Sequence, residues 1–371
     1  MSARRPPQSI HAHTAQSAPA VPATSKRLPF IDALRGLAAL WVVIFHIGEG
    51  RHVAALQSAL PTWLNLALFE SGHLGVPIFF VLSGFVIALS IGRDRVTARY
   101  GARFALRRAI RLDLPYWASI AITLAFAAVK AHLRPGTGLP ITTTPQLLAH
   151  LVYLQDFLGY RSINTVYWTL CYEIQFYLMF CMLLGVAHAC RRDANDRRPQ
   201  AILFTLAAIT SVVWPLLPAL HVRGLALPNW HGFLLGAFVF WTLSGVMRAR
   251  WFALYALALT GVFARTHDAF TMACLIMAVI LLLVGRAGHL TDWLRTHTLQ
   301  WLGKVSYSLY LLHLPITGAA FFALDKVFAH TPVQNGMAAL IVITLNCLAA
   351  WLFWRTVERP SSALAKRIRK A

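Results

Sequence analysis

The sequence predicts an all-α protein, a polytopic integral membrane bundle of about ten transmembrane helices with both termini cytoplasmic. Three observations predict this class. First, 58% of the 371 residues are hydrophobic and only 13% are charged, whereas about a quarter of the residues in soluble domains are charged. Second, apolar runs of near spanning length recur along the chain. Third, Lys and Arg gather in the connections on alternate sides of these runs.

The chain divides into one long membrane domain and two polar ends. Residues 1–28 are rich in Ala, Pro, Ser, Thr and Gln, a composition that predicts a disordered cytoplasmic tail. Residues 29–360 form the predicted membrane domain, and residues 361–371 form a basic cytoplasmic tail.

Hydropathy places the predicted spans in order along the membrane domain. Several are shorter than the roughly 20 residues that cross a bilayer, so the limits between residues 251 and 285 stay open. The stretch 147–160 is too short and too polar to span, and predicts an interfacial or re-entrant piece. The ten spans are 31–50, 73–92, 115–131, 166–188, 200–219, 228–246, 251–264, 270–285, 305–324 and 336–356.

The charge distribution predicts the orientation. The chain has 34 Lys and Arg against 13 Asp and Glu, a net charge of +21. With the N-terminus inside, 26 of the 34 basic residues fall on the cytoplasmic side and 7 outside, which is the bias that inner loops show. Topology therefore explains the basic residues, and we expect no nucleic-acid partner. The expected location is the bacterial cytoplasmic (inner) membrane, in contact with membrane lipids.

The five cysteines predict neither a disulfide framework nor a metal site. Four lie inside apolar runs, and no C-x-x-C pair occurs. We interpret them as buried small hydrophobic residues. The cysteines are Cys171, Cys181, Cys190, Cys274 and Cys347.

Ionisable residues inside the spans are the first candidates for function, because such groups are unfavourable in hydrocarbon and usually face a cavity or a partner. Arg35 and His46 lie eleven positions apart on the first span, on about the same face and separated by roughly 16 Å. Arg35 is expected near the cytoplasmic end and His46 in the outer half. The alternative is that Arg35 snorkels to the interface and His46 bonds locally.

Glu173 lies in the fourth span, within "NTVYWTLCYEIQFYLMF". Because this span runs from outside to inside, Glu173 is expected at about the depth of His46. A carboxylate beside an imidazole is typical of a general-base pair, so we expect the two side chains to meet. The alternative is a buried pair that only holds two helices together.

Two arginines stand out in the basic connection 93–113. Arg108 and Arg111 form an Arg-x-x-Arg pair in an otherwise apolar helical segment, and residues three apart share a helix face. Their forked guanidinium groups suit a phosphate-bearing ligand. The alternative is that both only set the topology.

Together these motifs resemble the acyltransferase family 3 membrane enzymes. The resemblance includes Arg35 and His46 with ten residues between them, "GVPIFFVLSGFVI" at 75–87, and the pair Arg108 and Arg111. It continues through "YWTLCYEIQFYL" at 167–178 to the last motifs, and covers roughly 30 to 360 in the same order. Those last motifs are "GKVSYSLYLLHLPI" at 303–316 and "VERP" at 357–360.

The resemblance implies a membrane O-acyltransferase. It would move an acyl group, usually acetyl, from cytoplasmic acyl-CoA (acetyl-CoA) onto a hydroxyl of a sugar, in a carbohydrate acceptor that is lipid-linked or free. No permanently bound cofactor is implied. The resemblance gives a catalytic role to His46, Glu173 and Arg35, and donor binding to Arg108 and Arg111. His46 would act as general base, or would itself be acylated; both routes stay open.

Further side chains are candidates for substrate binding. Ser83 and His313 are expected to line the same cavity and donate to the carbonyl oxygen; the alternatives are a helix-packing Ser-Gly step and a hydrogen-bonded buried histidine. Trp168, Tyr172 and Tyr310 are candidates for stacking on a sugar ring, although aromatic residues at span ends also anchor helices at the interface.

Other functions stay open at this stage. Within the enzyme class, the acceptor is O-antigen or exopolysaccharide, or alternatively a small secondary metabolite such as a macrolide. Ten spans with a few buried charges also suit a transporter or flippase, although the sequence has no inverted repeat. A membrane-bound assembly or sensor protein without catalysis is the third class.

Overall fold

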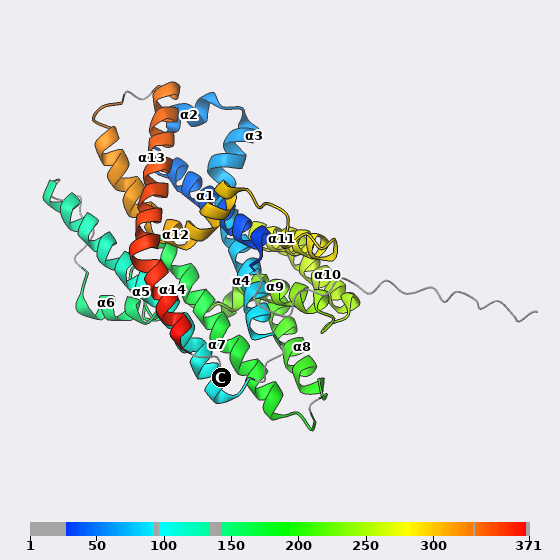
Figure 1. The fold of residues 1–371 in the computed structure, drawn as a ribbon. Coiled ribbons are helices and arrows are strands. Elements are labelled where there is room, and N and C mark those ends of the chain that lie inside the picture. The colour runs from blue at the N-terminus through cyan, green and yellow to red at the C-terminus, as the bar shows by residue number, and fades with distance from the viewer. Residues whose placement is uncertain (1–26, 93–95, 134–141, 194, 329–330, 369–371) are drawn as a thin grey trace, which may run out of the picture.

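The computed structural model is all-helical over the residues it describes, which are 27–92, 96–133, 142–193, 195–328 and 331–368. The two predicted tails fall largely or partly outside these ranges, at residues 1–26 and 369–371. The described part contains no strand, and the predicted all-α class is confirmed. Figure 1 shows the helices as one bundle, with α5 crossing it obliquely and α13 and α14 running down one side.

A helix occupies each of the ten predicted spans. The principal helices are α1 (Pro29–Glu49), α4 (Gly75–Ile91), α5 (Ala98–Leu133), α7 (Trp168–Ala189), α8 (Arg198–Val213), α9 (Trp230–Leu243), α10 (Ala249–Thr266), α11 (Ala269–Arg286), α12 (His297–Leu324) and α13 (Pro332–Phe353).

Short helical pieces connect or extend these helices. They are α2 (Ala54–Ala59), α3 (Thr62–Asn65), the π-helix η1 (Leu66–Glu70), η2 (Ser71–Leu74), α6 (Thr144–Leu151), η3 (Thr165–Tyr167), η4 (Trp214–Leu216), η5 (Pro218–Leu220), η6 (Leu227–Asn229), the π-helix η7 (Trp354–Glu358) and α14 (Arg359–Arg367). The predicted interfacial stretch 147–160 contains the last part of α6 and the turns that follow it.

Eight helices of the described chain are long and apolar enough to cross a membrane. The remaining two predicted spans are α9 and α10. With 14 residues, α9 is about 21 Å long, and every residue from 230 to 241 is buried. A helix that is apolar on all sides packs in the interior of a bundle, so α9 is the buried centre rather than a lipid-facing span.

Close backbone contacts fix the centre of the bundle. A Cβ on Gly84 of α4 would lie 1.9 Å from the Phe233 carbonyl oxygen, and a Cβ on Gly236 of α9 would lie 1.8 Å from the Val81 carbonyl oxygen. Small residues let membrane helices approach in this way. The Ser-Gly-Phe motif at 83–85 therefore includes a packing glycine.

A second pair of glycines fixes α1 against α12. A Cβ on Gly36 would lie 2.7 Å from the Gly303 backbone nitrogen, and one on Gly303 would lie 2.3 Å from the Asp32 carbonyl oxygen. This contact decides which helix the later residues of α1 face, because α1 continues along α12 towards His46 and His313.

Helix α5 begins earlier than the predicted third span, 115–131. Most of the connection 93–113 is helical, and α5 runs without a break from Ala98 through Pro115 to Leu133, over 36 residues or about 54 Å. Arg108 and Arg111 therefore lie on a long oblique helix.

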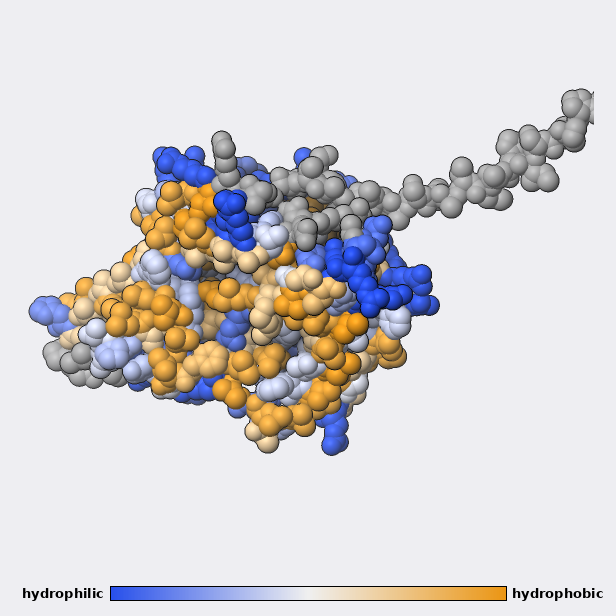
Figure 2. Space-filling view, turned by 90° about the horizontal axis from the view of Figure 1, so that it is seen from below, coloured by the Kyte–Doolittle hydropathy of each residue, from blue (hydrophilic) through white to orange (hydrophobic). Residues whose placement is uncertain are grey.

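The outer surface of the bundle fits a bilayer. Many large apolar side chains are exposed, among them Leu257 and Leu340, both 67% exposed. Figure 2 shows broad hydrophobic areas over this face, with hydrophilic residues gathered towards the edges. The core of a bilayer contains no water, so apolar side chains are ordinarily exposed on the lipid-facing surface of a membrane protein.

Candidate active site

His46 lies near the end of α1 and faces His313 of α12. His46 Nδ1 is 2.9 Å from the Val42 carbonyl oxygen and 3.2 Å from His313 Nε2. His313 is completely buried, and its Nδ1 is 2.7 Å from the Tyr310 carbonyl oxygen. The two imidazoles therefore form a hydrogen-bonded pair between α1 and α12.

These contacts fix the tautomers of both rings. A carbonyl oxygen only accepts hydrogen bonds, so His313 Nδ1 carries a proton, and its Nε2 in the neutral ring accepts one. His46 Nδ1 must then donate, shared between Val42 and His313. His46 Nε2 is left with a free lone pair, which is the state that a general base requires.

The free nitrogen of His46 faces Glu49. The two atoms, His46 Nε2 and Glu49 Oε2, are 3.7 Å apart, and the side chains of His46 and Glu49 are 15% and 63% exposed. A carboxylate at this distance stabilises an imidazolium once the base has taken a proton. Because Glu49 is exposed, the basic edge of His46 is reachable from that end of the bundle.

Glu173 occupies a different cluster. Its carboxylate accepts a hydrogen bond from Ser83 Oγ of α4 at 3.0 Å and a short one from the Tyr177 hydroxyl one turn further on α7. Arg108 Nη2 of α5 is 3.9 Å from Glu173 Oε1, and its guanidinium carbon is 3.9 Å from the centre of the Tyr177 ring. Glu173 thus connects α4, α5 and α7.

The predicted pairing of His46 with Glu173 is therefore wrong for the described residues. The polar neighbours of His46 are Val42, His313 and Glu49, whereas those of Glu173 are Ser83, Tyr177 and Arg108. The prediction considered the depth of the two residues in the membrane, but not which helices are neighbours. Residues at similar depth meet only if their helices are neighbours, and the glycine contacts set α1 against α12.

Of the remaining predicted residues, some make hydrogen bonds to other polar groups and the others only pack against neighbouring helices. Ser83 donates to Glu173, and His313 holds His46. Tyr310 is buried; its hydroxyl donates to the Val166 carbonyl oxygen at 3.2 Å and contacts Thr169 Oγ1 at 2.9 Å. Tyr310 therefore joins α12 to the start of α7 and presents no face to a sugar.

Trp168 and Tyr172 pack into an aromatic cluster. Their rings meet edge to face with centroids 5.2 Å apart, and both lie against Phe80 of α4. Both are half-buried. Their contacts are those of a packed helix interface between α7 and α4.

Arg35 and Arg111 belong to a third cluster with Glu358. Glu358 is buried at the end of η7 and accepts a 2.6 Å hydrogen bond from Ser308 Oγ of α12. Its carboxylate interacts electrostatically with Arg111 of α5 and Arg35 of α1. Arg111 also lies within electrostatic range of Arg108 and Arg35. Two helices, α1 and α5, thus bring cationic groups to one buried carboxylate, and α12 supplies its hydroxyl partner.

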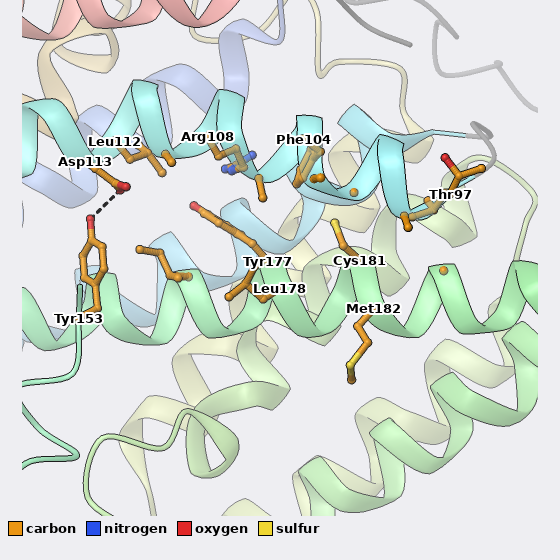
Figure 3. A pocket seen from close by; sticks show the side chains of 18 of the residues that line it. Thr97, Phe104, Arg108, Leu112, Asp113, Tyr153, Tyr177, Leu178, Cys181 and Met182 are labelled. Atoms are coloured by element: carbon orange, nitrogen blue, oxygen red, sulfur yellow. Dashed lines mark hydrogen bonds between the residues drawn. The ribbon is translucent and has the colours of Figure 1, made fainter. Parts of the chain in front are cut away.

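Arg108 faces a long groove between α5 and α7. The groove has a volume of about 830 Å³, within the range of ligand pockets. Figure 3 shows Arg108 and Tyr177 near its middle, with Thr97 at one end and the hydrogen-bonded pair Asp113 and Tyr153 at the other. Its lining includes Arg108 and excludes His46 and Arg35.

Three residues with polar contacts at these clusters were not selected from the sequence. Glu49 is three residues after His46, Tyr177 is four residues after Glu173, and Glu358 is the acidic residue of "VERP". Helical spacing from a selected residue was a usable signal for Glu49 and Tyr177. The signal for Glu358 was an acidic residue between two arginines, Arg355 and Arg359, directly after the last predicted span.

Comparison with known proteins identifies the family. The model of an acyltransferase domain, that of acyltransferase family 3, matches residues 28–355. Acyltransferase MdmB of Streptomyces mycarofaciens is 28% identical over an alignment of 373 positions, which covers 92% of this chain and 94% of that protein. No solved structure matches.

Two further relatives are longer than the chain. O-acetyltransferase OatA of Staphylococcus aureus (strain NCTC 8325 / PS 47) is 24% identical over 90% of this chain and 57% of its own length. Peptidoglycan O-acetyltransferase OatA of Listeria monocytogenes serovar 1/2a is 25% identical over 90% of this chain and 56% of its own length. The chain spans little more than half of each OatA protein. With the family model matching most of its length and its helices suited to a membrane, the chain belongs to acyltransferase family 3, as a multi-pass membrane acyltransferase.

Proposed function

We propose that the chain is an O-acetyltransferase that moves an acetyl group from acetyl-CoA to a hydroxyl of a sugar in a cell-surface glycan. The observation that carries the proposal is the free lone pair of His46 Nε2, fixed by the contacts of Nδ1 with Val42 and His313. The O-acetyltransferase relatives support this reaction type. Family membership sets aside the alternatives of a transporter and of a non-catalytic assembly or sensor protein.

In the proposed reaction, His46 Nε2 takes the proton of the acceptor hydroxyl as its oxygen attacks the thioester carbonyl. The C–O bond forms, the C–S bond breaks, and the leaving thiolate takes the proton back from the imidazolium. Glu49, at 3.7 Å, stabilises the charged ring between these steps. In the alternative route the same nitrogen attacks the thioester carbonyl and the C–S bond breaks, which releases the thiolate. The acceptor oxygen then attacks the acetyl-imidazole, the N–C bond breaks, and the hydroxyl proton passes to the thiolate.

Arg35 and Arg111 are proposed to hold the phosphates of the donor. They share one cluster around Glu358, and guanidinium groups bind phosphate with paired hydrogen bonds. Arg35 and His46 are eleven residues apart on α1, or about 16 Å, so the pantetheine arm would cover this distance. Arg108 is removed from the proposed donor site, because it contacts Glu173 and the groove.

The proposed location is the bacterial inner membrane with both termini cytoplasmic, which puts Arg35 on the side of the donor and Glu49 on the side of the glycan. A second candidate acceptor is a small secondary metabolite such as a macrolide. It is favoured by the nearly end-to-end match with MdmB, against the partial match with the OatA proteins.

The test uses membranes that contain the full chain, acetyl-CoA labelled in the acetyl group, and acceptors that include O-antigen, exopolysaccharide and a macrolide. We expect His46→Gln to lower acetyl transfer by at least about 100-fold. The matched control is His52→Gln, since His52 stacks on Phe321 in the connection after α1, away from His313. Wild-type transfer by His46→Gln would overturn the mechanism, and a wild-type chain that never consumes the thioester would overturn the function.

A further inference from the structure

The groove between α5 and α7 has a definite order of chemical groups along its length. From Val96 to Ala105, and opposite them from Leu178 to Ala189, the lining is mostly apolar, and its polar members, Thr97 and His188, lie at the end away from Arg108. Arg108 follows, and beyond it lie Asp113, Tyr153 and Trp117. α5 begins at Ala98. At 1.5 Å per residue the apolar part therefore covers about 10 Å of α5 as far as Ala105, and Arg108 and Asp113 are about 7.5 Å apart along the helix axis. An occupant should carry the same order of groups.

The apolar part is open towards the bilayer. Leu178, Met182 and Val186 line the groove and are 55%, 53% and 45% exposed. In a membrane protein such side chains face lipid, so the groove can be entered sideways from the membrane. Gly101 keeps its floor open, because a Cβ there would have no atom within 4 Å. These properties suit a long hydrocarbon chain.

Arg108 supplies one positive charge at the end of the apolar part. Its Nε has no hydrogen-bond partner among the described residues, and its Nη2 is 3.9 Å from Glu173, too far for a hydrogen bond. The ring of Tyr177 holds the guanidinium from one side. Nε is buried, so an anion in the groove would bind the Nη atoms, which make no hydrogen bond among the described residues. Phosphate is one of the groups that a guanidinium binds with paired hydrogen bonds.

The far end of the groove suits a sugar. Tyr153 donates to Asp113 Oδ1 at 2.9 Å, which leaves Oδ2 to accept from a sugar hydroxyl. Trp117 donates to the Leu151 carbonyl oxygen at 3.0 Å and keeps its ring 40% exposed. Tyr153 has a left-handed backbone with φ of 61°, and strained backbone of this kind is found at ligand sites.

The sugar end of the groove also adjoins the helix that carries His313. Tyr307 of α12 donates to the carbonyl oxygen of Leu112 at 2.9 Å, and Leu112 lines the groove beside Asp113. His313 lies six residues further along α12, or about 9 Å. A sugar at Asp113 is thus on the side of the groove nearest the proposed base.

We propose that this groove binds a lipid-linked acceptor, with its polyprenyl chain between Val96 and Ala105, its phosphate on Arg108 and its sugar at Asp113, Tyr153 and Trp117. This inference rests on the proposed function and names the substrate form. A long-chain acyl-CoA fits less well, because its pantetheine arm separates chain from phosphate and would place unpaired amide groups among apolar side chains.

The test measures binding separately from transfer. The full chain in phosphatidylcholine vesicles is irradiated with polyprenyl phosphate glucose that carries a diazirine in the prenyl chain, and labelled peptides are mapped by mass spectrometry. We expect labels in residues 96–112 and 174–189. Ala105→Trp, which fills the groove, should lower labelling at least tenfold, and so should Gly101→Leu. Leu106→Trp is the matched control, because Leu106 is 51% exposed and is not part of the lining.

Several outcomes would overturn the inference. They are unchanged labelling in Gly101→Leu that elutes as folded protein, equal competition by phosphatidylglycerol, and competition by palmitoyl-CoA without competition by unlabelled polyprenyl phosphate glucose. Its failure is distinguishable from that of the proposed function. Acetyl transfer to a soluble glycan without groove labelling refutes only the inference, whereas specific labelling without thioester consumption refutes only the proposed reaction.

Discussion

At the scale of single residues, the described structure places the candidate residues in three separate clusters. His46 and His313 form the basic pair, Arg35 and Arg111 surround Glu358, and Arg108 lies with Glu173 at the groove. The proposed base and the proposed donor site are thus at two levels of α1. This separation allows one variant to affect chemistry and another to affect donor binding.

His313 should influence the rate rather than donor binding. In His313→Phe, His46 Nδ1–H keeps only the Val42 carbonyl oxygen, so the ring is free to turn its basic edge away. We expect kcat to fall by up to about 100-fold, as small misplacements of catalytic groups do, with KM for acetyl-CoA unchanged. The measurement is steady-state kinetics on vesicles, with His52→Phe as control. An unchanged kcat would show that His313 has no part in holding the base.

Glu358 should influence donor binding. Glu358→Gln keeps a partner for Ser308 but removes the negative charge between Arg35 and Arg111. Without that charge Arg35 and Arg111 repel each other and lose their shared position. If this removes one charge-assisted hydrogen bond to the donor phosphate, worth about 1.5 kcal/mol, KM for acetyl-CoA should rise roughly tenfold, with kcat within about twofold. Glu358→Asp should restore part of the affinity. A rise in KM for the acceptor alone would place the donor elsewhere.

Residue types at the candidate site could be predicted from the sequence, but their pairing could not. Arg35, His46 and Glu173 stand out because ionisable groups are rare in spans. That His46 meets His313 instead of Glu173 depends on Gly36 and Gly303, which bring α1 onto α12. Spacing along one helix gives depth and face, but the identity of the neighbouring helix comes from packing of all the helices together.

At the scale of helices and their connections, His150 joins α6 to the loop after it through a contact with Ile163, which we call the clip and expect to be pH-sensitive. His150 is buried; its Nδ1 donates to the Gln146 carbonyl oxygen at 2.8 Å, and its Nε2 accepts from the Ile163 backbone N–H at 3.0 Å. Burial lowers the pKa of His150 below its ordinary 6.5. Protonation would turn the acceptor Nε2 into a donor and break the bond to Ile163.

The sign of the pH effect follows from the lowered pKa. The unfolded loop binds the proton more readily than the folded loop, so the clip is fully stable above about pH 6.5 and weakens as the pH falls below that value. Hydrogen exchange of the Ile163 amide, corrected for intrinsic rate, should therefore lose protection between pH 7 and pH 5. The Ala226 amide, which donates to the Gln175 side-chain oxygen at 2.9 Å, should keep its protection. Parallel behaviour of both amides would refute the clip.

Helix packing at α4 and α9 is equally open to test. In Gly84→Ala the new Cβ would lie 1.9 Å from the Phe233 carbonyl oxygen, so the two helices must separate. We expect a destabilisation of about 3 kcal/mol, seen as a lower midpoint of thermal unfolding in detergent. Gly261→Ala on α10, where a Cβ would meet no atom within 4 Å, is the control. Equal midpoints for both variants would mean that the contact is not tight.

Helices were easier to predict than their ends. All ten predicted spans are helical because long apolar runs satisfy their backbone in no other way inside lipid. The observed helix ends differ from the predicted ones where the prediction relied on charged residues or on the usual length of a span. Helix α5 begins at Ala98 inside the predicted connection, and α9 is a short central helix rather than a span of ordinary length. Burial of α9 on all sides depends on its neighbours, which hydropathy alone does not reveal.

At the scale of the whole molecule, the proposed function requires a fixed orientation in the membrane. The donor would reach Arg35 at one end of α1, and the acceptor hydroxyl would reach His46 towards the other end. The predicted distribution puts 26 of 34 Lys and Arg residues on the side of Arg35, and the proposed orientation therefore has this side in the cytoplasm, where acetyl-CoA is made. A reversed chain would present its proposed donor site to a compartment without donor.

Single cysteines in a cysteine-free background test this orientation. We expect Ser58→Cys, in exposed α2 after His46, to react with an impermeant maleimide added to intact cells. Asp193→Cys, in the exposed connection before α8, should react only after the membrane is opened. Each variant must retain acetyl transfer, so that the labelled protein is the active one. The reverse pattern in active protein would put His46 and Glu49 on the cytoplasmic side, and the proposed route from cytoplasmic donor to external glycan would then be wrong even if His46 were the base.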